Sequence, residues 1–315
     1  MRAYILRRLV VLPVMLLVMS LILFLLLFIR PGNAAFAVVG GFNSAASAKE
    51  FEHNLGLDRP WYEQYFEWAG HAVRGDLGNG LKPPRRSVND EIKQRIGPTV
   101  TIGILTIVMS AIIGIAVGIF SAVKRNSWLD YVLRVTTIAG ISVPNFWIAT
   151  LFVILPVIWW GWTPIERDYV TFTENPIGNL RILFWPSLVL SIGSAAFVAR
   201  IVRSSMLETL YSDHVRTARA KGLQERVVIF HHVFRSSLIT LITVLGLQFG
   251  TILGGSVIVE QVFAIPGLGS LTLDAVLTAD YILLLGMMMI FSTVFLLMTL
   301  LVDVLYTVAD PRIRY

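Results

Sequence analysis

The stretch HVRTARAKGLQERVVIF, residues 214–230, is basic and rich in small side chains within an otherwise apolar chain. Cations such as Arg216 and Arg219 can pair with carboxylates on another protein, and the alanines beside them leave room for close contact. Gly222 is a natural helix terminator, so we expect two short helices that separate at this residue. The pattern suits insertion into a groove on a partner. The alternative is a solvated loop whose charges only set membrane topology.

The sequence lacks the motifs of catalysis and nucleotide binding. The nearest approach to a Walker loop, GDLGNGLK at residues 75–82, has Leu81 where a lysine must follow the second glycine. There is no His-Glu-x-x-His or Gly-x-Ser-x-Gly, and the chain has no cysteine for disulfides, thiolate metal sites or nucleophiles. His231 and His232 would point about 100° apart on an α-helix, which does not suit a shared metal. We therefore predict that the chain is not an enzyme and holds neither a metal nor a cofactor of its own.

Composition identifies an integral membrane protein. Hydrophobic residues make up 56% of the 315 residues, charged residues only 15%, and the mean hydropathy is +0.72, whereas a soluble domain carries about 25% charged residues. Six windows are free of charge: Arg8 to Arg30, Arg95 to Lys124, Arg134 to Glu166, Arg181 to Arg200, Arg235 to Glu260 and Asp280 to Asp303. The shortest holds 18 residues, close to the roughly 20 that a helix needs to cross a bilayer. We predict an all-α protein with six transmembrane helices.

One further uncharged stretch, residues 31–48, is rich in Gly, Asn and Ser and is predicted to be a loop. The first apolar window could be a signal peptide cleaved near Ala35–Ala37, but its apolar core exceeds the roughly 7 to 15 residues of such peptides. We expect it to remain as the first span.

Basic residues predict that both termini are cytoplasmic. That orientation places these groups inside: Arg2, Arg7 and Arg8; Lys124 and Arg125; the basic run 200–235; Arg312 and Arg314. The short outer loops hold few cations, and a long outer segment translocates largely regardless of charge. In a membrane chain, a net charge of +6 reflects topology, so we expect no nucleic-acid binding.

Three segments follow from this topology. Residues 1–30 form the cytoplasmic amino terminus and the first transmembrane helix, and residues 31–97 form a long extracytoplasmic segment. Residues 98–315 form a five-helix core with a cytoplasmic loop at about 204–235. Pro98 is expected at the first turn of the second span.

Several residues inside the spans predict local features. Gly114 and Gly118, and likewise Gly250 and Gly254, have the spacing that lets helix backbones approach closely. Pro144 and Pro156 should kink the third span, and Pro186 should lie near the start of the fourth. Glu260 and Asp303, beside the ends of their windows, are expected at a hydrated interface.

The basic stretch resembles the "EAA" coupling motif of ATP-binding-cassette importer permeases, in which Glu-Ala-Ala and three further residues precede a glycine. Arg216, Thr217, Ala218 and Gly222 occupy the four positions, so the second alanine and the glycine match.

Further stretches resemble the dipeptide, oligopeptide and nickel permease family of these importers. They are RRLVVLPVMLLVMSLILFLLLFIRPGNAA, with Asn33 in place of the usual aspartate, LGLDRPWYEQYFEW followed by RGDLGNGL, VEQVFAIPGLGSLTLDAVLTADY, and LLVDVLYTVADPRIRY. The resemblance extends over essentially the whole chain.

This resemblance implies a permease subunit in a bacterial-type plasma (inner) membrane. Its implied partners are the lipid membrane, a second homologous permease, two ATP-binding subunits that bind ATP and Mg, and an extracytoplasmic solute-binding protein. The chain would form half of the pathway, with peptides as the default substrate; nickel, opines, glutathione and oligosaccharides are also carried in the family.

The resemblance also implies two contact sites. The ATPase-coupling loop would comprise Arg216, Thr217, Ala218, Arg219, Ala220, Lys221 and Gly222. The outer segment would dock the binding protein, and our candidate residues there are Asp58, Arg59, Trp61, Tyr62 and Tyr65. The interfacial aromatic belt is an alternative role for these aromatic residues.

Two other functions stay open from the residues alone. An ATP-independent channel or carrier would transport without ATPase subunits and should carry more polar side chains inside its spans. A membrane enzyme would need ionisable groups clustered at one depth, and only Glu260 and Asp303 are candidates.

Overall fold

The computed structural model describes residues 2–28, 53, 58–82, 84–166 and 168–309, and the predicted loop at residues 31–48 lies outside them. Within the described residues the regular elements are helical, apart from one isolated antiparallel bridge between Asn79 and Ser87. The chain divides into two compact units. Unit 1 is built from residues 99–265 and 298–315, and unit 2 from residues 2–98 and 266–297.

Five described helices are long and apolar enough to cross a membrane. They are α1 (Arg2–Phe28), α5 (Val88–Val123), α8 (Pro176–Leu210), α11 (Arg235–Val262) and α13 (Tyr281–Ala309). A further pair, α6 (Trp128–Ser142) and α7 (Asn145–Trp160), passes the same test jointly but is bent by 100°. The all-helical membrane fold is confirmed, and there are six spans when the bent pair counts as one.

The bend between α6 and α7 comes from Pro144. The residue before a proline is driven out of the helical region, and Val143 is extended at ψ 125°. Pro144 then caps the start of α7. The sequence predicted a kink here, but the helix breaks completely. Pro156 lies inside α7, four residues before its end at Trp160.

Two proline positions differ from the prediction. Pro98 lies inside α5, which begins at Val88 rather than beside the proline. Glu91 stabilises this early start, because it lies in the first turn of the helix, where a negative charge is favourable. Its carboxylate also pairs with Arg86 and Arg95, at 3.0 and 3.5 Å. Pro186 also lies well inside its helix, because Pro176 opens α8 at the favoured first position and Asn175 caps it.

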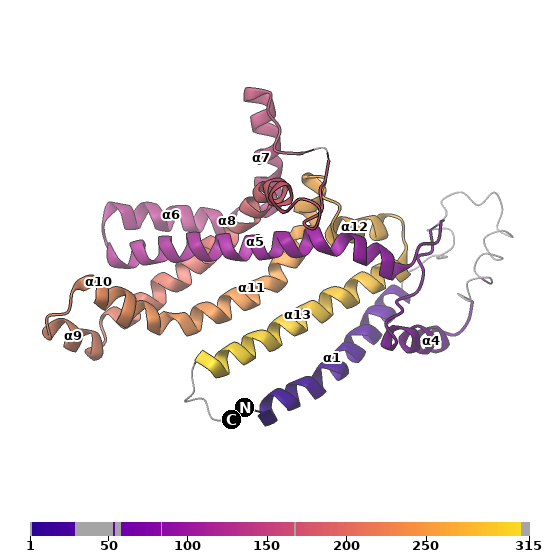
Figure 1. The fold of residues 1–315 in the computed structure, drawn as a ribbon, viewed down its shortest axis with the longest axis horizontal. Helices are drawn as coiled ribbons and strands as arrows, with labels where there is room; N and C mark the ends of the chain where they lie inside the picture. The colour runs from indigo at the N-terminus through magenta and orange to yellow at the C-terminus, as the bar shows by residue number, and fades with distance from the viewer. Residues whose placement is uncertain (1, 29–52, 54–57, 83, 167, 310–315) are drawn as a thin grey trace. The chain divides into compact units, whose positions relative to one another are not determined.

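Unit 1 is organised around α8, against which α6 and α11 pack. Gly114 and Gly118 let α5 approach α8 closely, as predicted: a Cβ at either glycine would lie 2.7 Å from Val198 or Val202, respectively. The prediction for Gly254 is wrong within this chain, since a Cβ there would meet no atom within 4 Å. Helices α9 (Asp213–Ala220) and α10 (Glu225–Val227) lie at one end of α8 and α11 (Figure 1).

Unit 2 combines α1 with the short helices α4 (Trp61–Val73) and α12 (Leu268–Leu277) and with parts of α5 and α13. Tyr65 joins α4 to α1. The centroid of its ring lies 5.4 Å from that of the Phe24 ring, and its hydroxyl oxygen lies 3.0 Å from that of Ser20. A second apolar cluster packs Val88 of α5 against Leu271 of α12 and Met287 of α13.

Candidate functional site

The basic stretch forms a compact turn between α8 and α11. Helix α8 ends at Leu210, and α9 follows from Asp213, an acidic residue that suits the first turn of a helix. Beyond Gly222 the chain enters α10 and then η1 (Val228–Phe234), a π-helical stretch that continues directly into α11. The prediction of two helices separated at Gly222 is confirmed.

Gly222 ends α9 in a Schellman motif. Its φ is +73°, in the left-handed region that glycine occupies at low cost. The Gly222 N–H donates to the carbonyl of Arg219 at 2.9 Å, and the Leu223 N–H reaches back to Ala218 at 3.4 Å. These two bonds are the ones that define the motif, so the backbone conformation explains the glycine.

Helix α9 buries one face and exposes the other. Val215 and Ala218, three residues apart on the same face, are 0% and 5% exposed and pack in one cluster with Met206 and Val228. Ala218 therefore belongs to the core of unit 1 and does not supply the shallow outer surface that the sequence suggested. The exposed face carries Arg216, Thr217, Arg219, Ala220, Lys221 and Gly222.

An ion pair closes the turn after α9. Arg219 donates from Nη2 to Oε1 of Glu225 at 2.7 Å and from Nε to Oε2 at 3.2 Å. The hydrogen bond from Arg219 lowers the pKa of the Glu225 carboxyl, and the Glu225 carboxylate raises the pKa of Arg219. Both side chains are largely exposed, so the pair orients the turn and adds little stability.

We expect Glu225→Gln to increase hydrogen exchange at Gly222 and Leu223 by up to about fivefold at neutral pH, which corresponds to about 1 kcal/mol. Because the folded-state pKa of Glu225 is lowered, the ion pair contributes above the unfolded pKa and is lost as pH falls through the folded pKa. The native chain and the variant should then exchange alike at acidic pH. Glu208→Gln, which removes a carboxylate on α8, is the control; an equal effect there would contradict the ion-pair explanation.

A buried ion pair holds α6 against α8, and the sequence analysis missed it. Asp130, 0% exposed, accepts two hydrogen bonds from Arg203, at 3.0 and 3.1 Å. It also accepts bonds from the Ser121 hydroxyl and the Asn126 backbone N–H, while Arg134 lies 3.6 Å away. The pair therefore ties the α5–α6 corner to α8 seven residues before that helix ends. The sequence does show that Asp130 lies three residues after the cap Ser127, but it gives no indication that Arg203 is its partner.

Glu260 is a second carboxylate that is fully buried. It is 0% exposed in α11 and accepts a hydrogen bond from the Thr99 hydroxyl at 2.7 Å. The expectation of a hydrated interface is therefore wrong for Glu260. Its neighbours explain the difference, because Val259 and Phe263 lie in an apolar cluster that surrounds this turn of the helix.

The candidate docking residues of the outer segment separate into exposed and buried groups. Asp58 pairs with His53 at 2.7 Å, which lowers the pKa of the aspartate, and Arg59 pairs with Glu67 at 3.0 Å. Trp61 and Tyr62 are 40% and 47% exposed. Tyr65 is 4% exposed, because it packs on α1, so its side chain is not part of an exposed surface.

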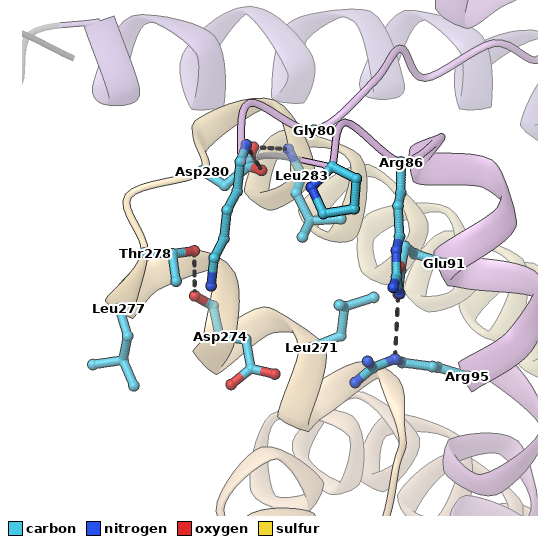
Figure 2. Close-up of a pocket in the computed structure, with 12 residues that line it drawn as sticks. Gly80, Arg86, Glu91, Arg95, Leu271, Asp274, Leu277, Thr278, Asp280 and Leu283 are labelled. Carbon is cyan, nitrogen blue, oxygen red and sulfur yellow. Dashed lines mark hydrogen bonds and ion pairs between the residues drawn. The ribbon is translucent and has the colours of Figure 1, made fainter. Parts of the chain in front are cut away.

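A polar cavity of about 510 Å³ lies within unit 2, between α12 and the start of α5. Figure 2 shows Arg86, Glu91 and Arg95 on one side and Asp274 on the other. The exposed Lys82 also lines the cavity and forms no ion pair with the described residues. Such a recess, with three cations and three carboxylates on its walls, can hold a charged segment of a polypeptide.

Asp280 fixes the loop on the rim of this cavity. One carboxylate oxygen accepts hydrogen bonds from the backbone N–H groups of Leu81 and Lys82, at 2.8 and 3.2 Å. The other accepts a hydrogen bond from the backbone N–H of Leu283, at the start of α13. A Cβ at Gly80 would lie 2.8 Å from the same carboxylate. The position of Lys82 is therefore set by a buried anchor.

Within the described part of the chain, no three His, Cys, Asp or Glu side chains come together in a way that could hold a metal ion. The two adjacent histidines lie in η1, where their ring centroids are 5.4 Å apart.

Two families match the chain. Residues 114–315 match the "Binding-protein-dependent transport system inner membrane component" family, and residues 1–80 match the amino-terminal region of such membrane components. The first match alone extends over more than half of the chain.

Individual relatives match the chain from end to end. A glutathione transport system permease protein of Escherichia coli O6:H1 is 38% identical over 313 residues, which cover 99% of each chain. An oligopeptide transport system permease protein of Bacillus subtilis is 34% identical over 316 residues, which cover 100% of each chain. Among solved structures, an inward-facing MetNI methionine ABC transporter matches with a TM-score of 0.56 at 17% identity, over 70% of this chain and 96% of that one. The last match concerns the fold alone.

Proposed function

The chain belongs to the family of binding-protein-dependent transport system inner membrane components, and from that premise we propose that it forms half of the translocation pathway for peptides. It is a multi-pass membrane subunit of an ATP-binding-cassette transporter. Peptides are the proposed substrate because full-length relatives are described as oligopeptide and glutathione permeases, and glutathione is itself a tripeptide.

The proposed complex contains this chain, a second homologous permease, two ATP-binding subunits and an extracytoplasmic solute-binding protein. ATP and Mg would bind to the ATP-binding subunits, and the permease would convert their closure into a change between inward-open and outward-open states. The distribution of basic residues supports cytoplasmic termini, with residues 31–97 outside and the loop at 204–235 inside. The family description supports a bacterial-type inner membrane.

The geometry of α9 is the observation that carries the coupling proposal. Its inner face is packed on Met206 of α8 through Val215 and Ala218, and its outer face presents Arg216 and Arg219. A force on the exposed face would therefore reach α8 through packed side chains and would reach α6 through the Arg203–Asp130 pair. We propose that the exposed face docks on an ATP-binding subunit.

Reconstitution tests this function directly. The complex would be purified with its co-expressed subunits, placed in lipid vesicles and supplied with a labelled peptide and its binding protein. Uptake that needs both ATP and the ATP-binding subunits is expected. Uptake by this chain alone, without ATP, would support a channel or carrier instead.

We propose that the binding protein docks on the outer segment through the exposed Asp58, Arg59, Trp61 and Tyr62 and through the cavity that contains Lys82. An acidic side chain of the binding protein would enter that cavity and pair with Lys82, while Arg86 and Arg95 share the carboxylate of Glu91. The carboxylates of Asp274 and Asp280 also line the cavity, so the proposed attraction comes from Lys82 and not from a net positive charge.

We expect Lys82→Glu to raise the binding-protein concentration that gives half-maximal ATPase stimulation about tenfold, because charge at an interface governs encounter and binding. Arg85→Glu makes a similar charge change on an exposed residue outside the cavity lining and should have a much smaller effect. Equal effects of the two variants would contradict docking at the cavity. Deleting part of residues 56–81 should reduce uptake while the solubilised complex still assembles.

A further inference from the structure

Unit 2 contains a second cavity, of about 540 Å³, which lies among α1, α4, α13 and the start of α5. Apolar side chains dominate its lining, including Leu16 and Leu17 on α1 and Met289 and Ile290 on α13. Both α1 and α13 are membrane-spanning helices. An apolar hollow between spanning helices lies at the depth of lipid chains.

Polar groups also line this cavity. Asn89 and Lys93 come from the first turns of α5, and Trp68 comes from α4. The buried indole Nε1 of Trp68 has no hydrogen-bond partner among the described residues, although a buried indole N–H usually finds one. The Lys93 side chain is 77% exposed, and its ammonium nitrogen is paired only loosely, 4.0 Å from a carboxylate oxygen of Asp90. The lining therefore offers a cation and an unsatisfied hydrogen-bond donor.

The cavity lies along the middle parts of α1 and α13. At a rise of about 1.5 Å per residue, Thr293 lies about 18 Å along α13 from its first residue, Tyr281. Leu16 lies about 18 Å along α1 from its end at Phe28. One hydrocarbon leaflet is about 15 Å thick, and both helices can tilt. Leu16 and Thr293 therefore lie about one leaflet away from those ends of α1 and α13.

We propose that this cavity binds one phospholipid. An acyl chain occupies the apolar part between α1 and α13, the headgroup phosphate lies at Lys93, and an ester oxygen accepts the hydrogen bond of Trp68 Nε1. This arrangement satisfies the unpaired indole and follows the usual place of tryptophan and lysine at the edge of a membrane. The proposal depends on α1, α4, α13 and the start of α5 and is independent of the transported substrate.

Photocrosslinking tests the proposal on the whole complex in lipid nanodiscs. The probe is phosphatidylethanolamine with a diazirine near the end of one acyl chain. Ala69 and Ala72 of α4 line the cavity, so Ala69→Phe should fill it. A Cβ at the neighbouring Gly70 would meet no atom within 4 Å, and Gly70→Phe adds the same ring on another face of α4 as the matched control.

We expect the probe to label Leu16, Leu17 or Met289 in the native complex. This labelling should be well above the level at Val10 and Leu26, two exposed α1 residues that report contact with bulk lipid. Ala69→Phe should reduce the cavity labelling at least fivefold, Lys93→Gln should weaken it, and Gly70→Phe should leave it unchanged. Ala72→Phe takes the place of Ala69→Phe if that variant fails to assemble.

Two results would overturn the proposal. Labelling at the cavity residues that equals the level at Val10 and Leu26, with no response to Ala69→Phe, would show ordinary bulk contact. Labelling that is absent in the native complex would show that the hollow is closed to lipid, for example by a helix of another subunit. In both cases the importer function would stand, because peptide uptake is measured separately.

Discussion

Asp130→Asn should destabilise the purified complex by about 3 to 5 kcal/mol and strongly reduce transport, which makes it the most damaging single change that we expect. The carboxylate is fully buried. The substitution removes its negative charge, so Arg203 is left inside unit 1 without its paired anion. Breaking one half of a buried ion pair has this cost because the remaining charge stays desolvated. Loss of structure as a function of temperature or denaturant measures the first effect, and ATP-driven uptake measures the second.

The controls for Asp130 separate burial from charge. Asp90 also lies in the first turn of its helix, but its side chain is 67% exposed and lies 4.0 Å from Lys93. Asp90→Asn should therefore change stability by less than about 1 kcal/mol. Asp130→Leu combined with Arg203→Met should cost less than the sum of the two single variants, because no unpaired charge remains. Additive losses would contradict a direct pair.

The same pair predicts a particular kind of functional defect. If Arg203 and Asp130 transmit movement from α8 to α6, then a variant that still assembles should hydrolyse ATP without matching uptake. The ratio of peptide transported to ATP hydrolysed should fall, whereas a purely structural defect would lower both rates together. This ratio is the measurement that tests transmission.

The sequence was sufficient for the main architecture because membrane-spanning helices are set by length and apolarity. The apolar windows correspond to the spans, and the small-xxx-small spacing correctly identified Gly114 and Gly118 as positions of close helix approach. Gly222 was also interpretable, because a left-handed residue at a helix end is a local requirement.

Features that depend on tertiary contacts could not be predicted in the same way. Asp130 and Arg203 are 73 residues apart, so their pairing had no local signature. Glu260 lies near the end of an apolar window but is buried because Thr99 approaches it from α5. Ala218 looked like part of a docking surface, but it is buried on the inner face of α9 because that face packs in one cluster with Met206 of α8. In each case an approaching helix, rather than local sequence, decides the environment.

Gly222→Val should abolish coupling, with a loss of at least tenfold in binding-protein-stimulated ATP hydrolysis or complete loss of the ATP-binding subunits during purification. The φ of +73° is unfavourable for any L-residue, by about 1 to 2 kcal/mol, and more so for a β-branched one. A Cβ at this position would meet no atom within 4 Å, so the effect is conformational rather than a clash. Loss of the Schellman bonds would release the end of α9 and misplace Arg219.

Two matched variants distinguish the shape of this turn from its charge. Asparagine tolerates the left-handed conformation, so Gly222→Asn should keep coupling within about twofold of the native complex. Gly222→Asp has nearly the same shape but adds a negative charge beside Arg219 and Lys221, so it should weaken docking to a cation-dependent partner. Full coupling in the valine variant would refute the role of α9. Equal activity of the asparagine and aspartate variants would show that packing, not charge, holds α9 on its partner.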